Sequence, residues 1–72
     1  MSLYIKNRID NIKTNGGSCH VQEDGFVSLK LNSGEKERIF PSQTFYWEYM
    51  QTPNEEGITF EDYMLLLFEQ TC

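Results

Sequence analysis

The sequence predicts an α+β protein with an N-terminal helix, a three-stranded antiparallel β-meander and two C-terminal helices packed on one face of the sheet. Three features predict it. Isoleucines recur at helical spacing near the start, two polar triplets that end in glycine separate short apolar stretches, and the C-terminal half is rich in aromatic side chains. Because 72 residues suffice for one small core, we expect a single domain spanning residues 1–72.

The first helix is expected over residues 3–15. Ile5, Ile9 and Ile12 follow one another at intervals of four and three residues, which places them on one helical face. Gly16 and Gly17 come next, and glycine accepts the left-handed conformation that closes a helix. The spacing therefore predicts an amphipathic helix that ends at the glycine pair.

The meander is expected over residues 18–40, and its first turn fixes the register of the first two strands. Taking residues 23–25 as a three-residue loop places Val21 opposite Val27 and Cys19 opposite Leu29. These four residues and Leu31 then share one face, whereas a shift by one residue would split them between two faces. Burial of apolar side chains therefore favours this register.

The second turn is expected at residues 32–34, again with glycine in the last position. The same reasoning places Leu31 opposite Glu35 and Val27 opposite Ile39. The third strand, residues 35–40, then carries four charged side chains in a row, which suits an edge that must not recruit further strands.

A short helix is expected over residues 43–51, after Pro41 ends the sheet and with Ser42 as the N-cap residue. Phe45 and Tyr49 lie four residues apart and would share a face. The alternative is a fourth strand, because residues 44–49 are rich in strand-forming side chains. Residues 52–57 contain proline, asparagine and glycine, and predict a loop.

The last helix is expected over residues 60–70, with Thr59 and Asp62 arranged as in a capping box. Its core stripe comprises Phe60, Met64, Leu67 and Phe68. Leu65 and Leu66 widen the apolar surface beyond this stripe, so the helix is expected to have a second neighbour. We therefore consider a homodimer formed through Leu65 and Leu66.

Charge is distributed unevenly along the chain. Residues 39–72 hold six carboxylates and no Lys or Arg, whereas residues 1–38 hold six bases and five acids. Nucleic-acid phosphates and anionic membranes both need a basic surface, so neither is an expected partner. A protein with a basic surface suits this charge distribution better. The alternative is a net charge that serves only to keep the surface hydrated.

Residues with catalytic or metal-binding potential are few. Cys19 and His20 are adjacent, so in a strand their side chains point to opposite faces and cannot act as a nucleophile and its base. Cys19, His20 and Cys72 lack both the paired spacing and the fourth ligand of a zinc site. We therefore expect no enzymatic activity, no cofactor and no metal. Two reduced cysteines and the absence of a signal peptide or membrane span indicate a cytoplasmic protein.

The expected contact surface is the aromatic and acidic stretch of residues 42–62. Four aromatic residues fall within residues 45–49, too many to face one core, and tyrosine and tryptophan are favoured in protein interfaces. The candidate contact residues are Tyr46, Trp47, Glu48, Tyr49, Glu55 and Glu56.

These features favour a small, non-catalytic module for protein interaction or regulation. A second hypothesis is an acidic protein that mimics nucleic acid and inhibits a basic DNA- or RNA-binding protein, as small proteins of phages and mobile elements do. A third is a structural subunit of a larger assembly. A fourth is a small enzyme or ligand-binding protein that uses His20 or a carboxylate pair.

Overall fold

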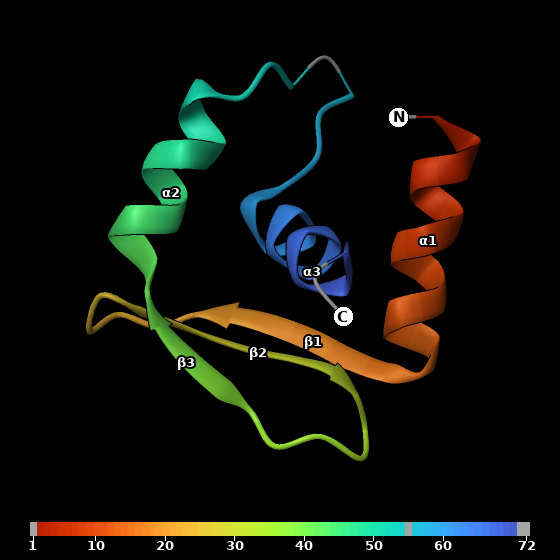
Figure 1. Ribbon diagram of the computed structural model, residues 1–72, viewed down its shortest axis with the longest axis horizontal. Coiled ribbons are helices and arrows are strands. Elements are labelled where there is room, and N and C mark those ends of the chain that lie inside the picture. Colours follow the sequence, from red (N-terminus) through yellow and green to blue (C-terminus); the bar gives the residue numbers. More distant parts are fainter. Residues whose placement is uncertain (1, 55, 71–72) are drawn as a thin grey trace.

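The computed structural model describes residues 2–54 and 56–70 and confirms the predicted fold class. Its elements are α1 (Leu3–Thr14), β1 (Gly16–Val21), β2 (Phe26–Asn32), β3 (Arg38–Pro41), α2 (Ser42–Gln51) and α3 (Phe60–Gln70). The strands form one antiparallel sheet in the order β1-β2-β3. Figure 1 shows α3 above the sheet, viewed along its axis, with α1 and α2 on either side. All three helices therefore lie on the same side of the sheet.

Helix α1 has the predicted apolar face, with Ile9 and Ile12 buried. The hydroxyl of Ser2 caps its start by accepting a hydrogen bond from the amide of Ile5 at 3.2 Å. Strand β1 begins at Gly16, two residues earlier than predicted, and Gly16 has a φ of 93°. Glycine thus lets the chain turn into the sheet with only Asn15 between α1 and β1.

The first hairpin has the predicted register, with Val21 opposite Val27 and Cys19 opposite Leu29. Gly25 has a φ of 90°, as a three-residue loop with a bulged glycine requires. Cys19, Val27 and Leu29 are buried beneath the helices. Val21 shares their face but lies at the end of the strand and is 48% exposed, so its expected burial is wrong.

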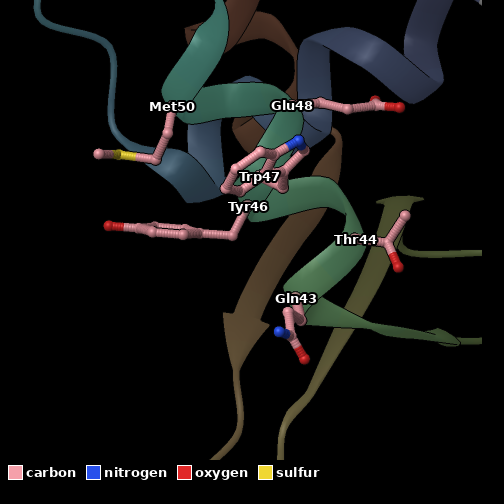
Figure 2. Close-up of a pocket in the computed structure, with 6 residues that line it drawn as sticks. All are labelled: Gln43, Thr44, Tyr46, Trp47, Glu48 and Met50. Carbon is pink, nitrogen blue, oxygen red and sulfur yellow. The ribbon is translucent and has the colours of Figure 1, made fainter.

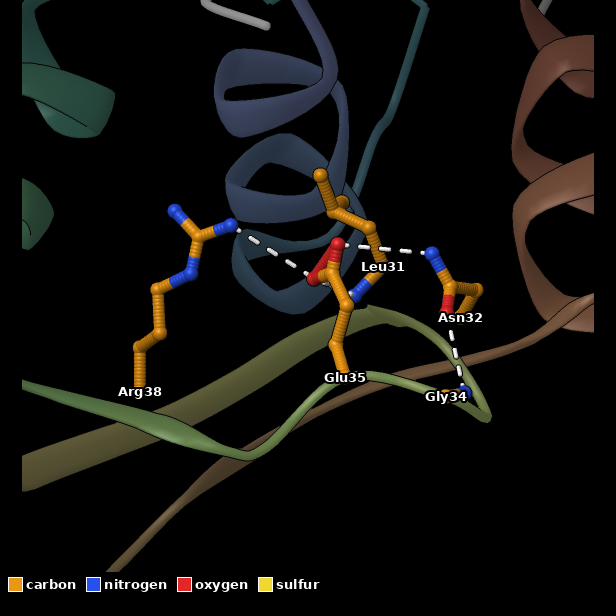
Figure 3. Close-up of polar contacts among 5 residues, drawn as sticks. All are labelled: Leu31, Asn32, Gly34, Glu35 and Arg38. Atoms are coloured by element: carbon orange, nitrogen blue, oxygen red, sulfur yellow. Dashed lines mark hydrogen bonds and ion pairs between the residues drawn. The ribbon is translucent and has the colours of Figure 1, made fainter.

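The predicted register of the second hairpin is wrong by one residue, because Val27 lies opposite Phe40 and Ser28 opposite Ile39. Strand β3 also begins at Arg38 rather than at Glu35. Figure 3 shows that the Glu35 carboxylate accepts a hydrogen bond from the backbone amide of Leu31, at 3.3 Å. This side chain satisfies a donor that a longer third strand would otherwise have paired.

Two further contacts hold the Glu35 carboxylate in this turn. The Asn32 side-chain amide donates to it at 3.3 Å, and the Arg38 guanidinium lies 3.5 Å away. The carbonyl oxygen of the same Asn32 side chain accepts from the amide of Gly34 at 2.9 Å. Side-chain hydrogen bonds therefore hold this turn, and strand β3 begins only at Arg38.

The observed register turns Phe40 toward the helices and Ile39 away from them. The Phe40 ring stacks on Phe68 at a centroid distance of 4.8 Å and meets Phe45 edge-on at 5.7 Å. Ile39 is 59% exposed on the opposite side. Burying the larger aromatic ring removes more apolar surface from water, which favours this register over the predicted one.

Residues 42–51 are helical, so the helix prediction is confirmed and the alternative of a fourth strand is wrong. The predicted N-cap is also wrong: Pro41 occupies that position, and Ser42 is the first helical residue. The Ser42 hydroxyl and backbone amide both donate to the carbonyl oxygen of Gly25, at 2.9 and 3.0 Å. These bonds tie the start of α2 to the β1–β2 turn.

Helix α3 has the predicted bounds, and its Thr59 hydroxyl accepts from the amide of Asp62 at 3.2 Å. Phe60 and Met64 of the predicted core stripe are buried as expected, but the other buried residues differ from the prediction. Leu65 and Leu66 are 1% and 8% exposed, whereas Leu67 and Phe68 are half-buried. The sheet and α1 both contact α3, so the second neighbour of this helix is its own chain. The apolar surface that suggested a dimer through Leu65 and Leu66 is thus already covered.

One hydrophobic cluster joins the helices to the sheet. Its buried members are Ile12, Cys19, Val27, Leu29, Phe60, Met64 and Leu65. Half-buried aromatic residues of α2, β3 and α3 surround it. In the described part of the chain, the other face of the sheet carries no helix, and both Phe26 and Ile39 are exposed there.

Candidate functional site

Helix α2 has no fully buried residue, unlike α1 and α3. Phe45 and Tyr49, four residues apart, face the core: Phe45 packs near Phe68 at 5.7 Å, and the Tyr49 ring lies 5.3 Å from Tyr63. The remaining face of α2 turns to solvent. One face of α2 therefore packs on the core, and the opposite face is exposed to solvent.

The exposed face of α2 is unusually apolar. Trp47 is 66% exposed, Met50 63% and Tyr46 48%. In Figure 2 the side chains of Tyr46 and Met50 extend to the same side of the helix, with Trp47 beside them. Because these positions are three and four residues apart, the helical repeat gathers them into one patch. We call these three residues, together with Glu48, the α2 surface.

A shallow hollow of about 670 Å³ lies along this face. Its lining comes entirely from one helix: Gln43, Thr44, Tyr46, Trp47, Glu48 and Met50. The Tyr46 ring meets Phe60 edge-on at 5.2 Å, which fixes one side of the hollow to the core. Trp47 and Met50, by contrast, are both more than half exposed.

The carboxylates of α2 and α3 are only partly neutralised. In α3, Asp62 pairs with Lys13 at 3.1 Å and Glu69 with Arg8 at 3.0 Å. Glu48 on α2 and Glu61 on α3 have no ion-pair partner among residues 2–54 and 56–70. The negative charge that remains unpaired thus includes the carboxylate within the α2 surface itself.

The structure places the predicted contact residues in three settings. Tyr46, Trp47 and Glu48 lie together on α2, whereas Tyr49 turns inward and its hydroxyl donates to the carbonyl oxygen of Ile58. Glu56 is half-buried in the loop before α3, and Glu55 lies outside the described residues.

Sequence reasoning did not select Met50 as a contact residue, although it lies four residues after Tyr46. Its exposure completes the patch. That spacing is the signal that could have identified it, since residues four apart share a helical face.

The Asn54 side chain makes three hydrogen bonds around the loop that joins α2 to α3. Asn54 donates to the carbonyl oxygen of Ile58 at 2.8 Å and to the Tyr49 hydroxyl at 3.1 Å. Its own carbonyl oxygen accepts from the amide of Ile58 at 3.0 Å. This network fixes the inward orientation of Tyr49, and thereby sets which residues of α2 remain outside.

Cys19 and His20 point to opposite faces of β1, as predicted: Cys19 is buried, and His20 is exposed. Burial, reinforced by the negative charges of Glu61 and Asp62, raises the pKa of the Cys19 thiol to about 12. At neutral pH this thiol is therefore protonated and a poor nucleophile.

Cys19 is a free thiol, and Cys72 lies outside the described residues. Across residues 2–54 and 56–70, no three His, Cys, Asp or Glu side chains are grouped closely enough to hold a metal ion.

Comparisons with protein-family models, with curated proteins and with solved structures found no match. Among the described residues, no helix has the length and apolar character needed to cross a bilayer.

Proposed function

We propose that this chain is a non-catalytic interaction module that binds a partner protein through the α2 surface. The observation that carries the proposal is the exposure of Trp47 and Met50 on a helix that buries none of its own residues. Tryptophan contributes strongly to binding when a partner buries it, because it brings a large rigid area at a low entropy cost. A free helical face with this composition is best explained by an interface.

The partner is expected to combine apolar and basic side chains. Apolar groups would fill the hollow beside Trp47, and Lys or Arg would meet Glu48, which lacks an ion pair within the described chain. An amphipathic helix with one basic edge has this chemistry, since its apolar residues recur at the spacing of the α2 patch. The cytoplasm is the compartment we propose, where a free thiol such as Cys19 stays reduced.

Mimicry of nucleic acid receives less support from the arrangement of charges. Phosphate mimicry needs several unpaired carboxylates spaced along a surface, and Asp62 and Glu69 are each bound to a base of α1. An experiment can separate the two hypotheses, because a nucleic-acid mimic would bind its partner through charge and would not need Trp47.

Selection of peptides from a random displayed library tests the proposal. The wild-type chain is the bait, and the double variant Trp47→Ala/Met50→Ala is compared with a matched double variant on the open sheet face, Phe26→Ala/Ile39→Ala. We expect recovered peptides to be both basic and apolar, and to lose at least tenfold in affinity for the α2 variant alone (about 1.4 kcal/mol). Equal binding to both variants would contradict the proposal.

A further inference from the structure

The two edges of the sheet differ in how they are protected. The β3 edge is only four residues long, contains the charged Arg38 and ends in Pro41, which has no N–H to donate. The β1 edge has the sequence Gly-Gly-Ser-Cys-His-Val, with neither a permanently charged residue nor a proline. Edge strands that lack such protection readily accept another strand.

The hydrogen-bonding pattern shows which β1 groups point outward. The amide of Gln22 donates to the carbonyl oxygen of Phe26 at 2.8 Å, so this pair is a hydrogen-bonded one. Such pairs alternate along an antiparallel ladder, so Ser18 and His20 face β2, and Cys19 and Val21 turn their N–H and C=O groups outward.

Strand β2 obeys the same alternation. The amide of Leu31 donates to Glu35, on the β3 side, and the carbonyl oxygen of Gly25 accepts from the amide of Ser42. The N–H and C=O groups of the odd-numbered residues of β2 therefore point to β3, and those of the even-numbered residues point to β1. Within the described residues, no hydrogen bond reaches the outward backbone groups of Cys19 and Val21.

A groove runs beside this edge. It has a volume of about 360 Å³, and its walls are β1, the last turn of α1 and the start of α3. Cys19 and Leu65 form its apolar floor, and Lys13, Glu61 and Asp62 its polar rim. Lys13 pairs with Asp62, which leaves the Glu61 carboxylate as the unpaired charge of the rim. Burial chiefly, and the two carboxylates to a lesser extent, raise the pKa of the Cys19 thiol, so this part of the groove is uncharged at neutral pH.

We propose that the β1 edge binds an extended segment of a partner protein as a fourth strand, with a Lys or Arg side chain of that segment lying in the groove against Glu61. Backbone hydrogen bonds to Cys19 and Val21 would supply affinity, and the groove would supply specificity. The aliphatic stem of the basic side chain would lie over the exposed part of Cys19 while its charge reaches the rim. This site is separate from the α2 surface and does not depend on it.

A second copy of this chain is a weaker candidate for the fourth strand. Pairing two β1 strands about a two-fold axis would bring both helical layers to the same side of the joined sheet, with the Glu61 and Asp62 rims of both copies beside the junction. Like charges in such a position oppose association. A basic peptide brings the opposite charge.

The test uses two synthetic peptides with blocked ends, Thr-Lys-Val-Lys-Val-Lys-Thr and Thr-Glu-Val-Glu-Val-Glu-Thr. Amide exchange and chemical shifts are followed by NMR on the full chain. In the free protein we expect rapid exchange for the amides of Cys19 and Val21 and slow exchange for His20. The basic peptide should slow exchange at Cys19 and Val21 and bind at least about tenfold more tightly than the acidic one.

Three changes probe the mechanism. Val21→Pro removes an outward N–H but no hydrogen bond between β1 and β2, and it should weaken peptide binding about fivefold or more. Val21→Thr keeps the N–H and should bind the peptide as the wild type does. Glu61→Gln should weaken binding of the basic peptide about two- to fivefold. A peptide N-methylated along the edge that faces β1 should bind several-fold less tightly, and it serves as the test even where Val21→Pro disturbs folding.

Several results would overturn the proposal. The first is equal affinity for the basic and the acidic peptide. The second is equal affinity for the basic peptide with and without N-methylation, and the third is slow amide exchange at Cys19 and Val21 in the dilute free protein. Protection that appears only at high protein concentration, together with a doubled mass in light scattering, would identify a second copy as the fourth strand and would also overturn it. Unchanged affinity in the Trp47→Ala variant is expected, since this site does not use α2.

Discussion

Gly17 lies where α1 packs tightly against the sheet, and Gly17→Ala tests that packing. A Cβ atom at this position would collide with the Cγ2 atom of Ile12 and would lie 2.8 Å from the Ile12 carbonyl oxygen and 2.9 Å from that of Leu31. Two of these neighbours are backbone atoms, which cannot swing aside as a side chain can. The added methyl group must therefore push α1 away from β1.

The expected loss of stability follows from two opposing terms. Replacing glycine by alanine stabilises a protein by about 0.4–1 kcal/mol where the backbone tolerates it, because the unfolded chain loses freedom. Overpacking a tight contact destabilises by about 1–3 kcal/mol, and more where backbone must move. We expect a net loss of roughly 1–2 kcal/mol, against a total of about 4–11 kcal/mol for a chain of 72 residues.

Urea denaturation measures this loss, and Gly34→Ala is the matched control. Gly34 has only the Asn32 side-chain oxygen near its Cβ position, and this tight contact of 3.3 Å offsets the usual gain from alanine, so stability there should change by less than about 0.5 kcal/mol. With a slope of about 1 kcal/mol per molar urea, the Gly17→Ala midpoint should fall by roughly 1–2 M. A midpoint equal to or above that of the wild type would refute the close packing of α1 on β1.

Three other changes have defined outcomes. Leu65→Ala should lower the free energy of unfolding by about 2–5 kcal/mol and Met50→Ala by less than about 0.5 kcal/mol, because Leu65 is buried and Met50 is exposed; comparable losses in urea titrations would contradict this. Asn54→Ala should cost about 1–2 kcal/mol and lower the melting temperature by several degrees, through loss of its bonds to Ile58 and Tyr49; an unchanged melting temperature would contradict this role. In a Cys72→Ser background, Cys19 should react slowly with iodoacetamide at pH 8 until urea unfolds the chain. The pKa of Cys19 is higher in the folded state than in the unfolded state, so the thiol's contribution to stability is present below about pH 9 and is lost as the pH rises toward 12. Rapid labelling of the native chain would contradict the raised pKa, as would stability that does not fall over this pH range.

The sequence predicted those parts of the fold that depend on local patterns. The isoleucine spacing identified α1, and the apolar alternation around Gly25 fixed the register of the first hairpin. In both cases neighbouring residues contain the information, because a shift by one position would expose several apolar side chains.

The second hairpin shows where such reasoning stops. Ile39 and Phe40 are adjacent apolar residues, so the pattern of β3 permits either of them to face the core. The choice is made by Phe45 and Phe68, which come later in the chain and surround the Phe40 ring. The capture of the Leu31 amide by Glu35 is likewise a side-chain contact that no periodicity predicts.

Leu65 illustrates the same limit for α3. A helix that is apolar on several sides must be buried on several sides, and that part of the prediction was sound. The sequence could not show that α1 and the sheet together enclose it, because their positions depend on the whole topology. The predicted homodimer through Leu65 and Leu66 thus relies on a surface that this chain covers itself.

The candidate site was predicted in part. The crowding of aromatic residues in α2 indicated that some of them face solvent, and Trp47 does. Which ones face inward depends on the position of α3 and on the Asn54 network that holds Tyr49, and neither is visible in a local pattern. The groove beside β1 is formed by three elements that are distant in sequence, so no local sequence motif predicts it.

The fluorescence of Trp47 tests the proposed role of α2 most directly, because it is the only tryptophan in the chain and lies within the α2 surface. In the free protein we expect the long-wavelength emission of a water-exposed indole and strong quenching by acrylamide. Titration with a basic, apolar peptide recovered by the library selection should shift the emission to shorter wavelength and reduce the quenching. Emission and quenching that stay unchanged at saturating peptide would show that partners bind elsewhere.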